Sequence, residues 1–156
     1  MILSMRMRNI ALIEELSLEF GEGLHVMTGE TGAGKSIVVD AVNLVLGGRA
    51  ARELIRTGTD KAWVEAVFDA SGNEEVAKWA QAQELDDFDG TVTLYREITR
   101  SGRNLCRVCG VVMPLSAFSR VSTRVWSSAA RTPSASGCIS PARMASAFCT
   151  ESRFSA

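Results

Sequence analysis

Eight consecutive residues near the start of the chain have the types and spacing of a phosphate-binding loop. They follow the Walker A pattern of a glycine, four free positions, a second glycine, a lysine and a serine: Gly29-Glu30-Thr31-Gly32-Ala33-Gly34-Lys35-Ser36. The three glycines lack a Cβ, so their backbone can adopt positive φ and direct several N–H groups at one anion. Lys35 can bring a mobile positive charge to the β- and γ-phosphates of a nucleotide, and the Ser36 hydroxyl is placed to bind Mg²⁺.

The sequence on both sides of this loop supports the motif. Residues 24–28 form a short apolar run that is typical of a buried strand, and His25 within it is interpreted as a packed side chain. Residues 36–46 predict an apolar helix that ends at the glycine pair 47–48, and its positive dipole end would point at the phosphates. A glycine-rich turn with an incidental Lys-Ser is the alternative, which the strand–loop–helix context argues against. We therefore predict a nucleotide phosphate site.

The size and composition of the chain limit the classes of protein that it could belong to. With 156 residues it is one domain or part of one, and 46% hydrophobic residues allow a buried core. A net charge of −1 gives no global basic signal for nucleic acid or a membrane surface. No apolar run has the length of a membrane span, and the first residues lack the layout of a signal peptide. A cytoplasmic protein is the resulting expectation.

Four cysteines raise the question of a metal site or disulfides. Cys106 and Cys109 have ligand-like spacing, whereas Cys138 and Cys149 form no second close pair and no histidine lies nearby. Metal or redox use is therefore the weaker interpretation, and we expect small apolar residues in a strand instead.

The elements that position the phosphate loop follow from the hydrophobic pattern. Strands are predicted at 2–8, 16–20, 62–69, 91–99 and 104–109, a connector at 9–13 and a polar loop at 56–61. A helical turn is predicted at 49–55, a helix at 73–85 capped by Ser71 or Asn73, and a short amphipathic stretch at 115–121. Many short strands around a single strand–loop–helix unit favour an α/β fold of the α+β lobe type over a repeating doubly wound sheet.

The character of the chain changes after residue 121. Residues 122–156 are dominated by Ser, Ala, Arg and Thr, contain no Leu, Lys or Asp, and have Glu151 as their only acid. Because their apolar residues follow no sustained period, we expect a disordered, low-complexity tail. The chain thus divides into a lobe at 1–121 and a tail at 122–156.

Several segments of the lobe resemble the RecN family of bacterial DNA repair proteins. The resemblance includes residues 2–15 followed by the phosphate loop, and then residues 47–50, 55–58, 64–68 and 96–103. These segments occur in order and at natural spacing from residue 1 to about residue 121. Glu30 and Thr31 inside the loop favour RecN over other members of the structural-maintenance-of-chromosomes (SMC) group.

The resemblance implies a P-loop NTPase fold, here the N-terminal half of an ABC/SMC-type head. RecN-like proteins are ATPases that act on broken DNA in recombinational repair in the bacterial cytoplasm, associated with the nucleoid. In the family, the two ends of one chain form a head, and two heads of a homodimer enclose ATP. On this resemblance Gly29 to Ser36 bind ATP and Mg²⁺. Arg8 and Asn9, or the loop 57–61, are candidates for contacts with the base or ribose; the alternative for Arg8 and Asn9 is a surface pair at a strand end.

The sequence also departs from the family pattern. The family's histidine- and glutamine-rich segment, coiled coil, signature motif and acidic Walker B strand do not follow residue 121. Because hydrolysis needs carboxylates for Mg²⁺ and water, we predict a chain that binds nucleotide and does not hydrolyse it alone, with no catalytic residue. The first functional hypothesis is the ATP-binding part of a RecN-type protein. The alternative is a non-catalytic truncated fragment or pseudogene product, and a stand-alone kinase or GTPase is disfavoured.

The unusual tail has a testable explanation. Residues 125–138 can be back-translated with codons ending in G or C, and this DNA can then be read one base earlier. With suitable codon choices the shifted frame gives Leu, Val, Glu, Gln and Leu at the positions where the family's histidine- and glutamine-rich segment has them. The hypothesis is that residues 122–156 are an out-of-frame tail, and a natural disordered extension is the alternative.

Four arginines around the hairpin at 96–107 are candidate contacts for DNA phosphates. They are Arg96, Arg100, Arg103 and Arg107. Because single charges of this kind are usually only solvated, the preferred expectation is a set of exposed side chains.

Overall fold

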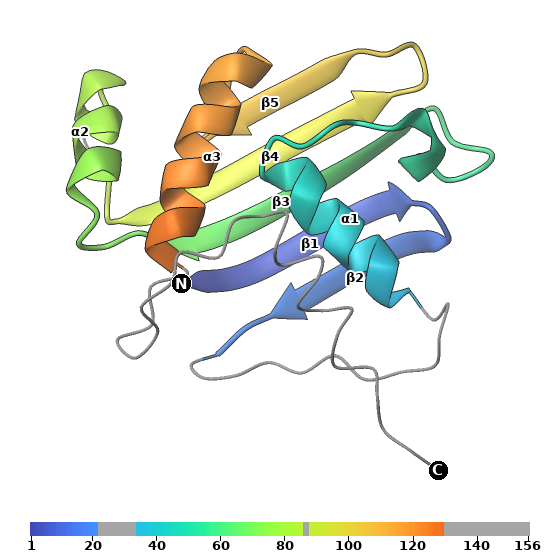
Figure 1. Cartoon of the computed structure of the whole chain (residues 1–156), viewed down its shortest axis with the longest axis horizontal. Helices are drawn as coiled ribbons and strands as arrows, with labels where there is room; N and C mark the ends of the chain where they lie inside the picture. Colours follow the sequence, from blue (N-terminus) through green and yellow to red (C-terminus); the bar gives the residue numbers. More distant parts are fainter. Residues whose placement is uncertain (22–33, 86–87, 130–156) are drawn as a thin grey trace.

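A six-stranded antiparallel sheet forms the centre of the fold, with the strand order β2-β1-β3-β4-β5-β6. The structure is a computed structural model that describes residues 1–21, 34–85 and 88–129. Two helices, α1 and α3, lie across one face of this sheet, and α2 packs beside α3 (Figure 1). Within the described ranges the arrangement is therefore two layers, one of strands and one of helices.

The strands are β1 (Ile2–Ile10), β2 (Ile13–Glu19), β3 (Lys61–Asp69), β4 (Thr91–Thr99), β5 (Asn104–Val108) and β6 (Val111–Met113). The helices are α1 (Lys35–Val45), α2 (Glu74–Ala82) and α3 (Leu115–Ala129), with a 3₁₀ turn η1 at Arg52–Leu54.

The core lies between the sheet and the helices because side chains alternate between the two faces of each strand. In β3 the buried members are Ala62, Val64, Ala66 and Phe68. Neighbouring strands add Met5, Met7, Val92 and Leu94, and the helices add Val38, Leu44, Phe118 and Val125. The buried side chains of the strands, which recur at every second residue, therefore pack against the apolar faces of the helices on one side of the sheet.

The opposite face of the sheet carries polar and aromatic side chains that bond with one another. Trp63 stacks on Tyr95 with ring centroids 5.8 Å apart, and the Arg107 guanidinium lies 5.6 Å from the Tyr95 ring centroid. The Tyr95 hydroxyl donates to Glu97 at 3.1 Å, and Lys61 pairs with the same carboxylate at 3.2 Å. Burial, followed by the charge of Glu97, raises the pKa of Tyr95 to about 12.

Most predicted elements are confirmed, with small shifts in their bounds. The predicted connector at 9–13 is instead a tight β1–β2 hairpin, because Asn9 and Ala11 adopt positive φ of 57° and 49° and reverse the chain within a few residues. Strand β6 was not predicted, since three residues are too few for a visible alternation. Asn73 caps α2 as expected, accepting from the backbone N–H groups of Glu75 and Val76. The predicted strand at 24–28, including His25, lies outside the described residues.

The expected boundary between lobe and tail requires a correction. Helix α3 continues past residue 121 to Ala129, so residues 122–129 do not belong to a disordered tail. The buried face of α3 continues beyond Phe118 through Val121, Ser122, Val125 and Trp126, which are spaced as one side of a helix requires. Ser122 fits this buried stripe because its hydroxyl donates to Leu46 O at 2.9 Å. The rest of the predicted tail, 130–156, lies outside the described residues.

Candidate nucleotide-binding site

The last three residues of the predicted phosphate loop lie at the beginning of α1. Gly34 is the residue before the helix, and Lys35 and Ser36 form its first positions. The remaining loop residues, Gly29, Glu30, Thr31, Gly32 and Ala33, lie outside the described residues, so their role stays a prediction. The structure therefore places the predicted lysine and serine at a helix N-terminus, where the motif requires them.

Gly34 has a backbone conformation that other residues rarely adopt. Its φ of 94° and ψ of −5° lie in the left-handed region, where a Cβ would be strained. The space beside it is less restrictive, because a Cβ built on Gly34 would lie 4.0 Å from Ile13 Cδ1, an ordinary contact. The glycine is thus needed for the direction of the chain as it enters α1.

The beginning of α1 has the electrostatic character of an anion site. Among the described residues, no side chain caps this end of the helix, and its first turn contains no acidic residue. The first N–H groups of a helix have no intrahelical partner, and together they carry a partial positive charge. In most helices a Ser, Thr, Asp or Asn side chain satisfies one of these groups. A helix N-terminus without such a cap can instead bind an anion.

The β1–β2 hairpin lies at the same end of the sheet as the beginning of α1 (Figure 1). The hairpin is held to the chain after α1, because Ala11 N donates to Leu54 O at 2.7 Å and Ile10 bridges to Ile55. Leu12 at the hairpin tip is 82% exposed, which is unusual for a leucine. The hairpin therefore forms one side of the surface around the helix N-terminus.

Of the candidates for base or ribose contacts, Asn9 is hydrogen-bonded to the loop 57–61, whereas Arg8 is not part of this contact. Asn9 Nδ2 donates to Lys61 O at 3.3 Å, and Arg56 N donates to Asn9 O at 2.9 Å. Asn9 and the loop 57–61 thus belong to one surface. Arg8 is exposed and lies between Glu15 and Trp63 on the sheet face opposite α1, which favours its alternative interpretation as a surface residue at a strand end.

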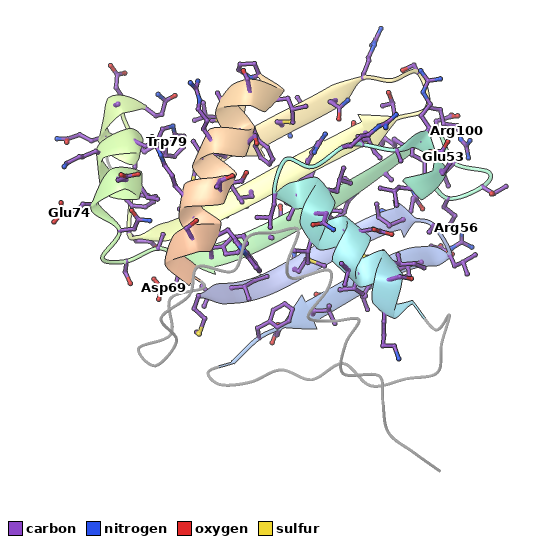
Figure 2. All side chains as sticks on the ribbon, in the orientation of Figure 1. Glu53, Arg56, Asp69, Glu74, Trp79 and Arg100 are labelled. Carbon is purple, nitrogen blue, oxygen red and sulfur yellow. The ribbon has the colours of Figure 1, made fainter. Side chains whose placement is uncertain are left out.

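The loop 57–61 is also tied to the hairpin that follows β4. Arg100 Nε donates to Thr59 O at 2.6 Å, and its Nη2 donates to Arg56 O at 3.0 Å. Figure 2 shows Arg56 and Arg100 close together at one end of the sheet, whereas Glu74 and Trp79 of α2 lie at the other end. Arg100 is therefore a structural link between two loops as well as a surface charge.

Arg96 contradicts the expectation of an exposed arginine. Its side chain is 1% exposed and donates to Leu44 O at 2.8 Å and to Gly48 O at 2.6 Å, both at the end of α1. Its Nε and Nη2 also donate to Asn104 Oδ1, at 3.3 Å and 3.0 Å. The alternation of β4 contained this signal, because Arg96 occupies an inward position between Leu94 and Ile98.

Of the four cysteines, Cys106 and Cys109 lie within the described residues, in β5 and directly after it. Cys106 is buried in β5 and Cys109 is half-buried after it, and burial raises the pKa of both thiols. In the ranges that the structure describes, His, Cys, Asp and Glu side chains form no group of three that could hold a metal ion. No helix in the same ranges has the length and apolar character needed to cross a membrane.

Comparison with known sequences identifies relatives of the N-terminal two thirds of the chain. Residues 4–105 match the family model of the AAA domain. The DNA repair protein RecN of Bacillus subtilis is 38% identical over 121 residues, which are 78% of this chain and 21% of that protein. RecN of Synechocystis is 42% identical over 106 residues, which are 67% of this chain and 18% of that protein. The chain thus spans about a fifth of the length of these relatives.

Solved structures with the same fold come from SMC and RecF proteins. One is an SMC ATPase studied for ATP-driven dimerisation and DNA-stimulated activation, with a TM-score of 0.65, 18% identity, and coverage of 97% of this chain and 92% of that chain. The SMC head domain of Thermotoga maritima has a TM-score of 0.58 and 21% identity, covering 74% of this chain and 40% of that chain. The recombination mediator RecF with ATP has a TM-score of 0.57 and 16% identity, covering 72% and 27%.

These structural likenesses confirm the expected fold, a mixed α/β half-head of the P-loop NTPase type. The sequence matches confirm the expected resemblance to RecN. The chain belongs to the AAA domain family, and its sequence is similar to the N-terminal part of the DNA repair protein RecN.

Proposed function

We propose that this chain is the ATP-binding part of a RecN-type DNA repair protein. Gly29 to Ser36 would bind the triphosphate, and the observation that carries the proposal is the beginning of α1. There a left-handed Gly34 leads into a helix with no side-chain cap and no acid in its first turn, and the first two helical residues are Lys35 and Ser36. Such an end attracts anions, and the sequence pattern specifies phosphate.

Each residue has a separate part in this binding. The backbone N–H groups of the glycine-rich segment would hold the phosphate oxygens, and Lys35 would neutralise charge on the β- and γ-phosphates. The Ser36 hydroxyl is the residue that would hold Mg²⁺, which supplies further neutralisation of the phosphate charge when bound. Asn9 and the loop 57–61 would approach the base or ribose, since both lie at the same end of the sheet as the beginning of α1 (Figure 1).

Binding without turnover is the expected behaviour of the chain alone. Phosphoryl transfer needs carboxylates that hold the metal and orient water, and the proposal assigns no catalytic residue to this chain. In the assembled protein, a C-terminal half-head and a second head would complete the site, and DNA would be the substrate of repair. Similarity to a DNA repair protein and to an SMC ATPase with ATP-driven dimerisation supports DNA and a second head as partners. A bacterial cytoplasmic location, at the nucleoid, is part of the same proposal.

Calorimetric titration of the full chain with MgATP tests the proposal. We expect saturable binding, and Lys35→Ala should weaken it at least tenfold because a direct phosphate contact is lost. Lys78→Ala is the matched control, since Lys78 in α2 is an exposed lysine far from α1. Equal affinities of Lys35→Ala and the wild-type chain would contradict the proposal.

A second candidate is a non-catalytic fragment that binds nucleotide at most. The composition of residues 130–156 favours it, because Ser, Ala, Arg and Thr dominate and Glu151 is the only acid. Sequencing the encoding DNA across codons 118–130 tests the out-of-frame explanation, which an intact frame without a RecN-like reading beside it would remove. An ATPase assay tests inactivity: turnover that Lys35→Ala abolishes would show that the chain is an enzyme.

A further inference from the structure

The C-terminal end of α1 is held by hydrogen bonds from two other elements. Arg96 of β4 donates to Leu44 O and Gly48 O, and Ser122 of α3 donates to Leu46 O. The last carbonyls of a helix have no intrahelical partner and carry a partial negative charge. These donors therefore satisfy the end of the helix that lies opposite the predicted phosphate loop.

Arg96 is the unusual member of this group because it is a buried charge whose partners are neutral. Its guanidinium bonds two backbone carbonyls and the amide oxygen of Asn104. Burying a charge without a charged partner is unfavourable. The negative end of α1 reduces this cost, and α1 has no basic residue of its own in its last turn. Arg96 thus supplies from β4 the positive charge that the helix itself lacks.

The turn after α1 is shaped to bring a carbonyl to Arg96. Gly48 N donates to Asn43 O at 2.8 Å, and a Cβ on Gly48 would lie only 2.7 Å from that oxygen. Gly47, with φ of 93°, packs against Ser119 at a distance that also leaves no room for a Cβ. The glycine pair therefore allows a close turn in which Gly48 O meets the guanidinium.

Directional bonds hold α1 in a way that its apolar contacts do not. The buried face of α1 packs against the sheet through Val38, Ala41, Leu44 and Val45. This packing fixes the distance between the helix and the sheet, but it resists sliding of the helix along its own axis less strongly. Bonds to Arg96 fix both the rotation and the axial position. Because a helix of 11 residues is a rigid rod about 16 Å long, a shift at Leu44 moves Gly34, Lys35 and Ser36 by a similar amount.

We propose that Arg96 is a positioning residue for nucleotide binding, which sets the place of Gly34, Lys35 and Ser36 by anchoring the opposite end of α1. The inference rests on the proposed function and adds to it a residue that touches no nucleotide. Asn104 orients the guanidinium by accepting from both Nε and Nη2, so that Nη1 is directed at the two carbonyls.

The test uses the full chain and three variants, with MgATP titration and amide NMR spectra as separate readouts. Arg96→Met removes the charge at similar length, and Arg96→Lys keeps a donor without the fork that reaches Asn104. Val76→Ala is the control for loss of stability alone, because Val76 is buried in α2, away from α1. Affinity is measured under conditions where unfolding curves show each variant to be folded.

We expect Arg96→Met to weaken MgATP binding about tenfold and Arg96→Lys by a smaller factor, with partial rescue by the retained charge. Without nucleotide, both variants should shift the amide signals of Gly34 and Lys35, and Val76→Ala should leave affinity and signals unchanged. If Arg96→Met does not fold, the MgATP affinity and the amide spectrum of Arg96→Lys test the inference instead. Wild-type affinity and unmoved signals in the folded Arg96 variants would overturn the inference. A wild-type chain that binds no MgATP would instead refute the proposed function. In that case the amide signals of Gly34 and Lys35 in the Arg96 variants would still test whether Arg96 positions α1.

Discussion

The two ends of α1 differ in how their unpaired backbone groups are satisfied. At the C-terminal end, donors from β4 and α3 bind the carbonyls of Leu44, Leu46 and Gly48, and the surroundings are buried. At the N-terminal end, Gly34 provides no side-chain cap and the first turn has no acid. One end is therefore fixed by the protein itself, whereas the other is the end that would bind an anion under the proposed function.

This difference indicates how a short helix can serve a ligand. The stability of α1 comes from its packed face and its anchored end, so the N-terminal end does not need a capping residue to keep the helix folded. A cap at that end would compete with phosphate for the same N–H groups. The contrast predicts that substitutions at the anchored end change stability, while substitutions at the beginning change binding.

The largest effect on stability is expected from Arg96→Ala. It removes the Arg96 donor from Leu44 O, which keeps the bond from Gly47 N, and from Gly48 O, and it opens a cavity. The combined cost should be about 3 kcal/mol in the free energy of unfolding. Urea unfolding of the variant and of Arg103→Ala, which removes an exposed arginine, provides the comparison. Equal stability of Arg96→Ala and Arg103→Ala would mean that the end of α1 is not anchored by Arg96.

Gly34→Ala should have the next largest effect, at the opposite end of the helix. A Cβ in the left-handed conformation costs about 1–2 kcal/mol per residue, and relief of that strain would turn Lys35 and Ser36 away from their present direction. We expect reduced thermal stability together with weaker MgATP binding. Gly21→Ala is the control, because Gly21 has no positive φ and no atom of the described residues lies within 4 Å of an added Cβ. Unchanged MgATP binding in Gly34→Ala would contradict the importance of this backbone direction.

Ser122→Ala should cost about 1 kcal/mol in unfolding free energy, the usual value for one lost hydrogen bond. The hydroxyl of Ser122 is buried and donates to Leu46 O, which has no other side-chain partner at the end of α1 among the described residues. Thr123→Ala removes a neighbouring hydroxyl that bonds within α3 on its exposed side, and it should cost less. A smaller loss for Ser122→Ala than for Thr123→Ala would show that α3 does not hold α1.

The smallest effect on stability is expected from Tyr95, which lies on the face of the sheet opposite the helices and contacts neither end of α1. The pKa of Tyr95 is raised to about 12 in the folded chain, so an unfolded chain loses this proton first, near pH 10. The contribution of Tyr95 is present below pH 10 and is lost as the pH rises toward 12, by about 1 kcal/mol after allowance for solvent screening. Urea unfolding at pH 8 and pH 11 measures it. Tyr95→Phe should remove this part of the pH dependence; an unaltered dependence would contradict the assignment.

The sequence predicts the parts of this molecule that depend on neighbours along the chain. The phosphate loop is one contiguous pattern, and the strands follow from local alternation, as in the segment from Trp63 to Phe68. The role of Arg96 was missed because an arginine is normally exposed, and its partners are 48 and 52 residues away. The extension of α3 was missed because Ser122 interrupts the apolar pattern, and its acceptor on Leu46 is known only from the fold.

The most direct test is an NMR titration of the full chain with MgATP. We predict large shifts of the amide signals of Gly34, Lys35 and Ser36, with much smaller shifts of those of Gly47 and Gly48 at the anchored end. If the signals at the beginning of α1 do not move at saturating MgATP, or if both ends move equally, the helix N-terminus is not the phosphate site, and the proposed function is wrong.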